Sequence, residues 1–168
     1  NLAALAQALV PLLPDLDSAR AVIDAFPDRF ADQHGASMRN KLGLNTQRPY
    51  DDTLANDFLS ILSDQEADFT RAFRALGTLS PIPDPADATL IAELNDPSAL
   101  TEWLARWRSR LTHEAAEDDE RRAQMTAVNP AVIPRNHRIE EMIQSAISGD
   151  MDPLHTLCSA LTHPFDVA

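Results

Sequence analysis

The amino-acid sequence predicts an all-α fold, a single helical domain of six to eight helices over residues 1–168. Composition is the first reason, because alanine and leucine are abundant while glycine occurs only 4 times, a usage that favours helix. Periodicity is the second, since the apolar residues of every long segment recur at about 3.6 residues and none alternates as in a half-buried strand. Length is the third, because 168 residues suffice for one sizeable core.

The first predicted helix carries leucines at positions 2, 5, 9 and 12 or 13, and prolines at 11 and 14 bend or end it. Asp17 or Ser18 is expected to cap the next helix, which Pro27 should kink or break near Asp24. The inward positions of this helix are Val22, Phe26, Phe30, Met38 and Leu42. Gly43 follows Leu42 at the place of a left-handed C-cap.

Two further helices are expected before a proline-rich linker over residues 78–87. Asp51 or Asp52 begins the first of them, with Leu54, Phe58, Ile61 and Leu62 inward. Ser63 and Glu66 have the spacing of a capping box. This box predicts a second helix that ends at Gly77 and buries Phe69, Phe73 and Leu76.

The strongest amphipathic pattern lies in the middle of the chain. A short helix is expected over residues 87–94, and Asp96-Pro97 then supplies a cap followed by proline at the first turn. The apolar stripe of the following helix is Leu100, Trp103, Leu104, Trp107 and Leu111. Residues 114–122 form a charged, exposed face, and Met125 returns to the core.

A proline-flanked arm precedes the last two predicted helices. Asn129-Pro130 and Ile133-Pro134 exclude regular helix between them. Asn136 is expected to cap a buried helix, and Arg135 to reach acceptors left free in the arm. The stripe of that helix is Ile139, Met142, Ile143, Ala146 and Ile147. Asp152-Pro153 begins the final helix, whose expected buried residues are Leu154, Leu157, Cys158 and Leu161.

The formal net charge of −12 argues against binding nucleic acid or an anionic membrane surface, because both interactions need Lys and Arg to meet phosphate. We interpret the excess acid as a solubilising surface. A single cysteine excludes an internal disulfide, and no apolar run is long enough to span a membrane. These features favour a cytoplasmic protein.

We assign no catalytic, cofactor-binding or metal-binding residue. The 5 histidines lack the spacing of a helical metal site, the glycines are isolated and cannot form a phosphate-binding loop, and Cys158 is expected in the core. Three basic pairs leave two readings open, an anion site or salt bridges to the chain's own acids, of which the second is commoner. These pairs are Arg39 with Lys41, Arg71 with Arg74, and Arg135 with Arg138.

Six motifs occur in an order that resembles a known family. They are Met38-Arg-Asn-Lys-Leu-Gly-Leu44, Asp68-Phe-Thr-Arg-Ala-Phe-Arg-Ala-Leu76, Trp103…Trp107…Arg110-Leu111, Asn129-Pro-Ala-Val-Ile-Pro-Arg-Asn136, Gly149-Asp150 and His163-Pro-Phe-Asp166. Together they resemble the C-terminal region of the selenoprotein O family, the YdiU-like protein adenylyltransferases. The similarity runs from about Leu12 to the last residues. Because the chain begins Asn-Leu-Ala, we expect it to be part of a longer protein.

The resemblance implies a bacterial parent enzyme with a kinase-like fold that transfers AMP from ATP to Ser, Thr or Tyr of proteins, with Mg²⁺ or Mn²⁺. The family's nucleotide-binding, metal-binding and catalytic residues belong to an N-terminal region, and none carries over to this sequence. Some members have a Cys or selenocysteine beyond the position matching Phe165, which Cys158 does not match. We therefore expect an inactive helical domain whose partners are the missing kinase-like region and, through the parent, protein substrates. The alternative is a self-standing acidic all-α interaction module.

Overall fold

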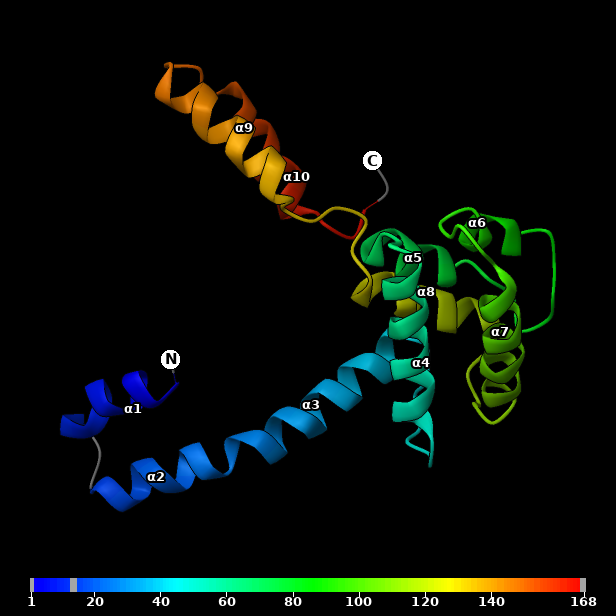
Figure 1. The fold of residues 1–168 in the computed structure, drawn as a ribbon, viewed down its shortest axis with the longest axis horizontal. Helices are drawn as coiled ribbons and strands as arrows, with labels where there is room; N and C mark the ends of the chain where they lie inside the picture. The colour runs from blue at the N-terminus through cyan, green and yellow to red at the C-terminus, as the bar shows by residue number, and fades with distance from the viewer. Residues whose placement is uncertain (1, 13–14, 167–168) are drawn as a thin grey trace. The chain divides into compact units, whose positions relative to one another are not determined.

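The computed structural model describes residues 2–12 and 15–166 (Figure 1). These residues form ten α-helices and one 3-10 helix and contain no strand, which confirms the all-α class. The elements are α1 (Leu2–Leu9), η1 (Val10–Leu12), α2 (Leu16–Asp24), α3 (Phe26–Lys41), α4 (Asp51–Asp64), α5 (Phe69–Leu76), α6 (Asp87–Ile91), α7 (Ser98–Leu111), α8 (Asp118–Val128), α9 (Asn136–Ile147) and α10 (Asp152–Thr162). The helices outnumber the six to eight expected because Pro27 separates α2 from α3, and the charged segment after residue 117 is itself helical.

Contacts between residues divide the chain into two units, Asn1–Met38 and Arg39–Ala168. In the first unit, α1 packs on α2, and Asp15 rather than Asp17 or Ser18 caps α2, since its Oδ1 accepts from the Ser18 amide at 2.7 Å. The break before Phe26 confirms the effect predicted for Pro27. Val22, Phe26 and Phe30, expected to point inward, are exposed. Leu13 and Pro14, invoked for the end of the first helix, lie outside the described residues.

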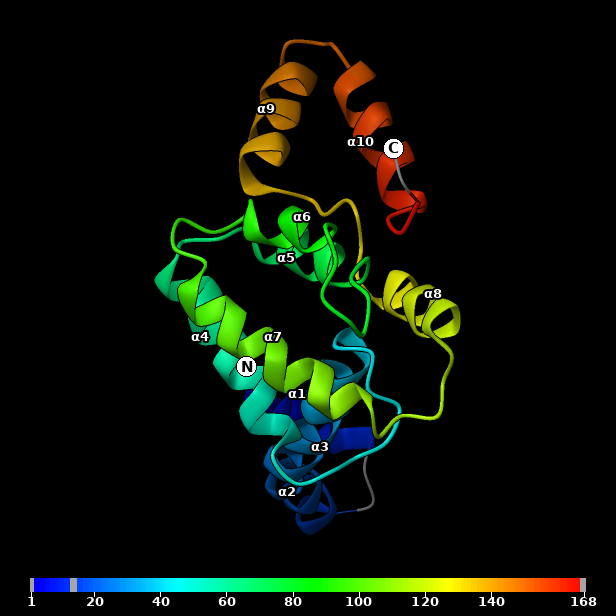
Figure 2. The same cartoon turned by 90° about the vertical axis from the view of Figure 1, so that its right-hand side faces the viewer.

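The core of the second unit is built on the two tryptophans of α7. Trp103 stacks on Phe58 of α4, with ring centroids 4.3 Å apart, and its Nε1 donates to the Leu54 carbonyl at 2.8 Å. Trp107 is also fully buried, and its Nε1 donates to the Leu42 carbonyl at 2.9 Å. Helices α4 and α7 lie side by side (Figure 2). All five positions of the predicted stripe of α7 are buried, and Met125 is buried as well.

The capping box predicted at Ser63 is wrong. Helix α4 continues through Ser63, and Glu66 has a left-handed backbone with φ of 52°. Asp68 caps the next helix instead, because its Oδ1 accepts from the Arg71 amide at 3.0 Å. Phe69 is then the first residue of α5, a place that leaves it 43% exposed rather than buried.

Helices α9 and α10 form an antiparallel hairpin and contact chiefly each other (Figures 1 and 2). Neither helix contains a buried residue, so the prediction of a buried helix after the arm is wrong, as is the core position of Cys158, which is exposed. Asn136 is the first residue of α9 and makes no cap hydrogen bond, contrary to expectation. The apolar residues of α9 and α10 stay partly exposed because each helix has one neighbour, which covers only one side of its apolar stripe. No described helix has the length and apolar character needed to cross a membrane.

Candidate functional site

Four of the six sequence motifs meet at the base of the α9–α10 hairpin. We call the five polar residues that join them the junction cluster, namely Lys41, Asp68, Arg74, Asn129 and Arg135. They come from the ends of α3 and α8, from α5 and its cap, and from the arm before α9. Residues far apart in sequence are therefore held together by hydrogen bonds that a motif-by-motif reading could not place.

The position of Lys41 is fixed by the turn that ends α3. The Leu44 amide donates to the Arg39 carbonyl at 2.9 Å, and the Gly43 amide to the Asn40 carbonyl at 3.1 Å, which is the Schellman pattern. Gly43 has φ of 73°, as predicted for a left-handed cap, and a Cβ built there would lie 2.7 Å from Met125 Sδ. Glycine is thus required by both backbone conformation and space.

Lys41 and Asn129 bind each other reciprocally. Lys41 Nζ donates to the Val128 carbonyl at 3.0 Å and to Asn129 Oδ1 at 3.2 Å, while Asn129 Nδ2 donates back to the Lys41 carbonyl at 3.0 Å. Asn129 is only 1% exposed, and the ammonium group lies 5.6 Å from the ring centroid of Phe73. Burial lowers the pKa of Lys41 from its usual 10.5, because a desolvated ammonium ion is disfavoured.

Arg74 joins both ends of the hairpin to α5. Its Nη1 donates to the carbonyls of Thr126 and Asn129, at 3.2 and 3.0 Å, and its Nη2 donates to the Phe165 carbonyl at 2.9 Å. Thr126 and Asn129 precede the arm, whereas Phe165 follows α10. The planar guanidinium group can satisfy carbonyls in several directions at once, which a lysine ammonium on a flexible stem does less rigidly.

Two further interactions close the base of the hairpin. The amides of Ala131 and Val132 both donate to the Pro164 carbonyl, at 2.7 and 3.1 Å. Arg135 Nη2 lies 2.6 Å from Asp68 Oδ2. Burial alone would raise the pKa of Asp68, but hydrogen bonds from the Arg71 amide and the charge of Arg135 outweigh it and lower the pKa from its usual 3.8. The sequence predicts that Arg135 reaches acceptors of the arm. In the structure it pairs with the Asp68 carboxylate instead.

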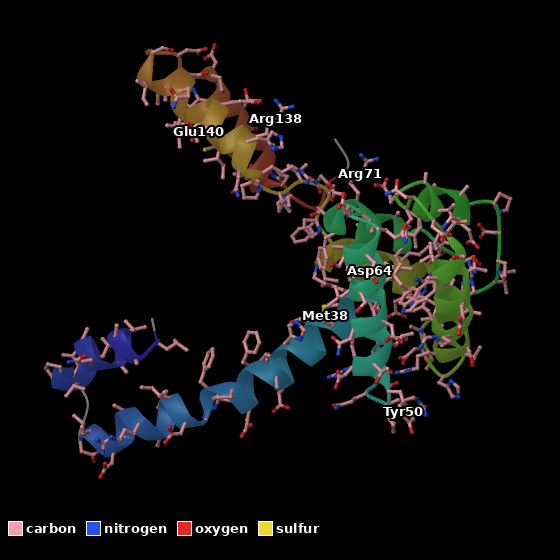
Figure 3. All side chains as sticks on the ribbon, viewed as in Figure 1. Met38, Tyr50, Asp64, Arg71, Arg138 and Glu140 are labelled. Carbon is pink, nitrogen blue, oxygen red and sulfur yellow. The ribbon has the colours of Figure 1, made fainter. Side chains whose placement is uncertain are left out.

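The sequence left two readings of the basic pairs open, an anion site or salt bridges to the chain's own acids, and the outcome differs between the residues of the pairs. Salt bridges account for Arg39 with Asp52 at 3.9 Å, Arg71 with Glu93 at 2.8 Å, and Arg138 with Glu141 at 2.8 Å. Arg71 and Arg138 lie at the surface, on α5 and α9 (Figure 3). Lys41 and Arg74 fit neither reading, because in the part of the chain that the structure describes they bind carbonyl and amide oxygens and no carboxylate.

Arginine has a second structural use that the sequence did not predict. The guanidinium group of Arg110 binds both carboxylate oxygens of Asp51, at 2.7 and 3.2 Å, and Glu114 Oε1 at 2.6 Å. Arg108 Nη2 donates to Asp87 Oδ1 at 2.6 Å and its Nε to the Ser80 carbonyl at 3.1 Å. Contacts of this kind, made in several directions by one planar group, suit the fork of arginine better than a lysine ammonium.

The chemistry available at the junction cluster is that of a structural joint. Its cations are occupied by oxygens of the chain, and its one carboxylate is paired with Arg135. The histidines at 34, 113, 137, 155 and 163 are all exposed. Among residues 2–12 and 15–166, no group of three or more His, Cys, Asp or Glu is placed to hold a metal ion.

A comparison with protein families and a comparison with individual proteins point to the same family. The family described as "Protein adenylyltransferase SelO" matches residues 1–162. The chain is 40% identical over 172 residues to protein nucleotidyltransferase YdiU of Bradyrhizobium diazoefficiens, covering 99% of this chain and 35% of that protein. The proteins of the same name from Nitrobacter winogradskyi and Methylorubrum extorquens are 43% and 42% identical over 171 and 177 residues, with 99% of this chain and 34% and 36% of theirs covered. The chain spans about a third of the length of these relatives.

Proposed function

Because the chain belongs to the SelO family of protein adenylyltransferases, we propose that it is the helical C-terminal domain of such an enzyme, supporting a kinase-like catalytic region without transferring AMP itself. In this proposal the parent protein transfers AMP from ATP to hydroxyl groups of substrate proteins in the cytoplasm. ATP and Mg²⁺ or Mn²⁺ bind to the region outside these 168 residues.

The observation that carries the proposal is the internal satisfaction of the junction cluster. Nucleotidyl transfer depends on cations and metal ions that neutralise phosphate charge. Lys41 and Arg74 would have to release the carbonyl oxygens of residues 128, 129 and 165 before meeting a phosphate. A nucleotide with its metal ion therefore fits these residues poorly, and the net charge of −12 opposes an approaching polyanion.

What the cluster does well is fix one part of the chain against another. It joins the end of α3, helix α5 with its cap, and both ends of the α9–α10 hairpin through hydrogen bonds and one ion pair. A domain of this kind supplies a rigid surface on which other parts of an enzyme can be positioned. The position of the motifs that resemble the family agrees with this role, because most of them build the joint rather than an open cleft.

The test is AMP transfer from labelled ATP, measured on the 168-residue chain and on the full-length protein. We expect label on protein substrates or on the enzyme itself with the full-length protein and none with the chain alone. Label transferred by the isolated chain would overturn the supporting role. Failure of both preparations, with both folded, would contradict AMP transfer by the parent protein.

A further inference from the structure

The first unit of the chain presents an apolar face that no other residue described in that unit covers. Leu5 and Leu9 of α1, Val22 of α2, and Phe26 and Phe30 of α3 are each between 41% and 64% exposed. A recess of about 200 Å³ between α1 and α2 is lined only by apolar side chains, among them Leu5, Leu9, Val22 and Phe26. A contiguous apolar surface of this kind is rare on a monomer and marks an interaction site.

The apolar residues follow one side of their helices. Phe26 and Phe30 are four residues apart in α3, which places them on the same side of that helix, and Val22 of α2 lines the same recess as Phe26. The ring centroids of Phe26 and Phe30 are 5.9 Å apart, and those of Phe30 and His34 are 5.7 Å apart. Charged residues lie elsewhere on these helices, as in the exposed pair of Arg20 with Asp17 at 3.4 Å. This pattern is typical of an amphipathic helix that packs on another element through its apolar side.

We propose that the face formed by Leu5, Leu9, Val22, Phe26 and Phe30 is covered in the full-length protein by the region outside these 168 residues. This inference rests on the proposed function, because it takes that region to be the kinase-like body of the same polypeptide. The relatives match 99% of this chain but are covered over only 34–36% of their own length, so a far larger stretch of polypeptide is available to pack on it.

Two physical arguments favour this occupant over a second copy or a separate protein. The net charge of −12 on each copy of these 168 residues disfavours the pairing of two copies through repulsion. The face itself lacks the charged groups that steer a separate partner into register. A segment of the same polypeptide needs no steering, since tethering keeps it at a high effective concentration.

The test places a photo-reactive benzoyl-phenylalanine at position 30, and separately at position 22, in the full-length protein. Tyr50 is the control position, because it is an aromatic residue that is 83% exposed and lies outside the face. After irradiation, mass spectrometry should join positions 22 and 30 to peptides outside the 168 residues, at a yield about tenfold or more above that from position 50, as expected for sites fixed in a packed interface.

Mixed isotope labelling separates links within one polypeptide from links between copies. Links confined to the 168 residues, links between differently labelled copies, or yields no higher than at position 50 would each overturn the inference. AMP transfer measured on the same preparations distinguishes the two proposals. Transfer without the expected links contradicts this inference alone, whereas the expected links in a folded protein that transfers no AMP contradict the proposed function alone.

Discussion

Helix α7 and the α9–α10 hairpin have the same kind of sequence pattern and opposite environments. In α7 the stripe that contains Trp103 and Trp107 is fully covered by α4 and its neighbours, whereas α9 and α10 bury no residue and Ile147 is 75% exposed. An apolar period specifies which side of a helix seeks cover. It does not specify whether other helices of the chain pack on that side. They do so on α7 in the core of the second unit, and only one helix does so on each helix of the hairpin.

The largest effect expected from this comparison is that of Trp107→Ala. It removes a fully buried indole and leaves the Leu42 carbonyl without its donor, so we expect a loss of about 3–5 kcal/mol in the free energy of unfolding. Urea unfolding measures it. The matched control is Ile147→Ala on the exposed side of α9, for which we expect a change within about 0.5 kcal/mol. Equal urea midpoints for the two variants would contradict the claim that the α7 stripe is buried in the core and the α9 stripe is not.

A second pair of variants compares the two asparagines that flank the arm. Asn129→Ala removes the side-chain donor to the partly buried carbonyl of Lys41 and an acceptor from its ammonium group, which should cost about 1–3 kcal/mol. Asn136→Ala should change stability by less than about 0.5 kcal/mol, because Asn136 is exposed and caps nothing. The sequence alone predicts about 1 kcal/mol for Asn136 as a cap. Thermal denaturation of both variants decides between the two expectations.

The pH dependence of stability provides a third comparison. Burial alone would raise the pKa of Glu114, but hydrogen bonds from Thr46, Arg110 and the Asn45 amide lower it from the usual 4.5. A carboxyl whose pKa is lowered by folding stabilises the protein fully above its unfolded value, and that contribution is lost as pH falls through the lowered value. The free energy of unfolding should therefore decline below pH 4.5. Glu114→Gln should reduce the slope of this decline, and an unchanged slope would show that the network contributes nothing.

The smallest effect concerns Arg135, which is paired with Asp68 at the base of the hairpin and is partly exposed. Arg135→Ala should lower global stability by only about 0.2–1 kcal/mol. Its local effect should be clearer, because amides of α9 and α10 should exchange faster while those of α7 stay unchanged. Hydrogen exchange with mass spectrometry measures both. Equal acceleration in α7 would mean that the hairpin and the core unfold as one unit.

The elements that the sequence predicted correctly are those determined by local chemistry. Pro27 breaks the helix it enters, Gly43 adopts the left-handed cap, and the stripe of α7 is buried. The wrong predictions concern where a helix begins and whether other helices pack on an apolar stripe. Ser63 was predicted as a cap, whereas α4 continues past it and Asp68 caps α5. Cys158 lies on an apolar stripe, but it is exposed because α10 buries no residue among those that the structure describes.

The junction cluster was only partly accessible from the sequence. Its motifs were recognised one by one, yet Lys41 and Asn129 are 88 residues apart and Arg74 binds main-chain carbonyls. A main-chain acceptor has no signature in the amino-acid sequence, because every residue has a carbonyl. The acidic excess pointed toward salt bridges, which four of the paired cations make, namely Arg39, Arg71, Arg135 and Arg138. Lys41 and Arg74 bind carbonyl and amide oxygens instead.

The central claim is that these 168 residues position other parts of an enzyme and bind no nucleotide themselves. Calorimetric titration of the chain with Mg-ATP tests it most directly, with tryptophan fluorescence confirming that Trp103 and Trp107 remain buried as in the folded protein. We predict heats no larger than those of dilution across the range in which nucleotide-binding enzymes saturate. Saturable binding with a dissociation constant of about 1–1000 μM, the usual range for enzymes and their substrates, would contradict the claim and locate a nucleotide site within the chain.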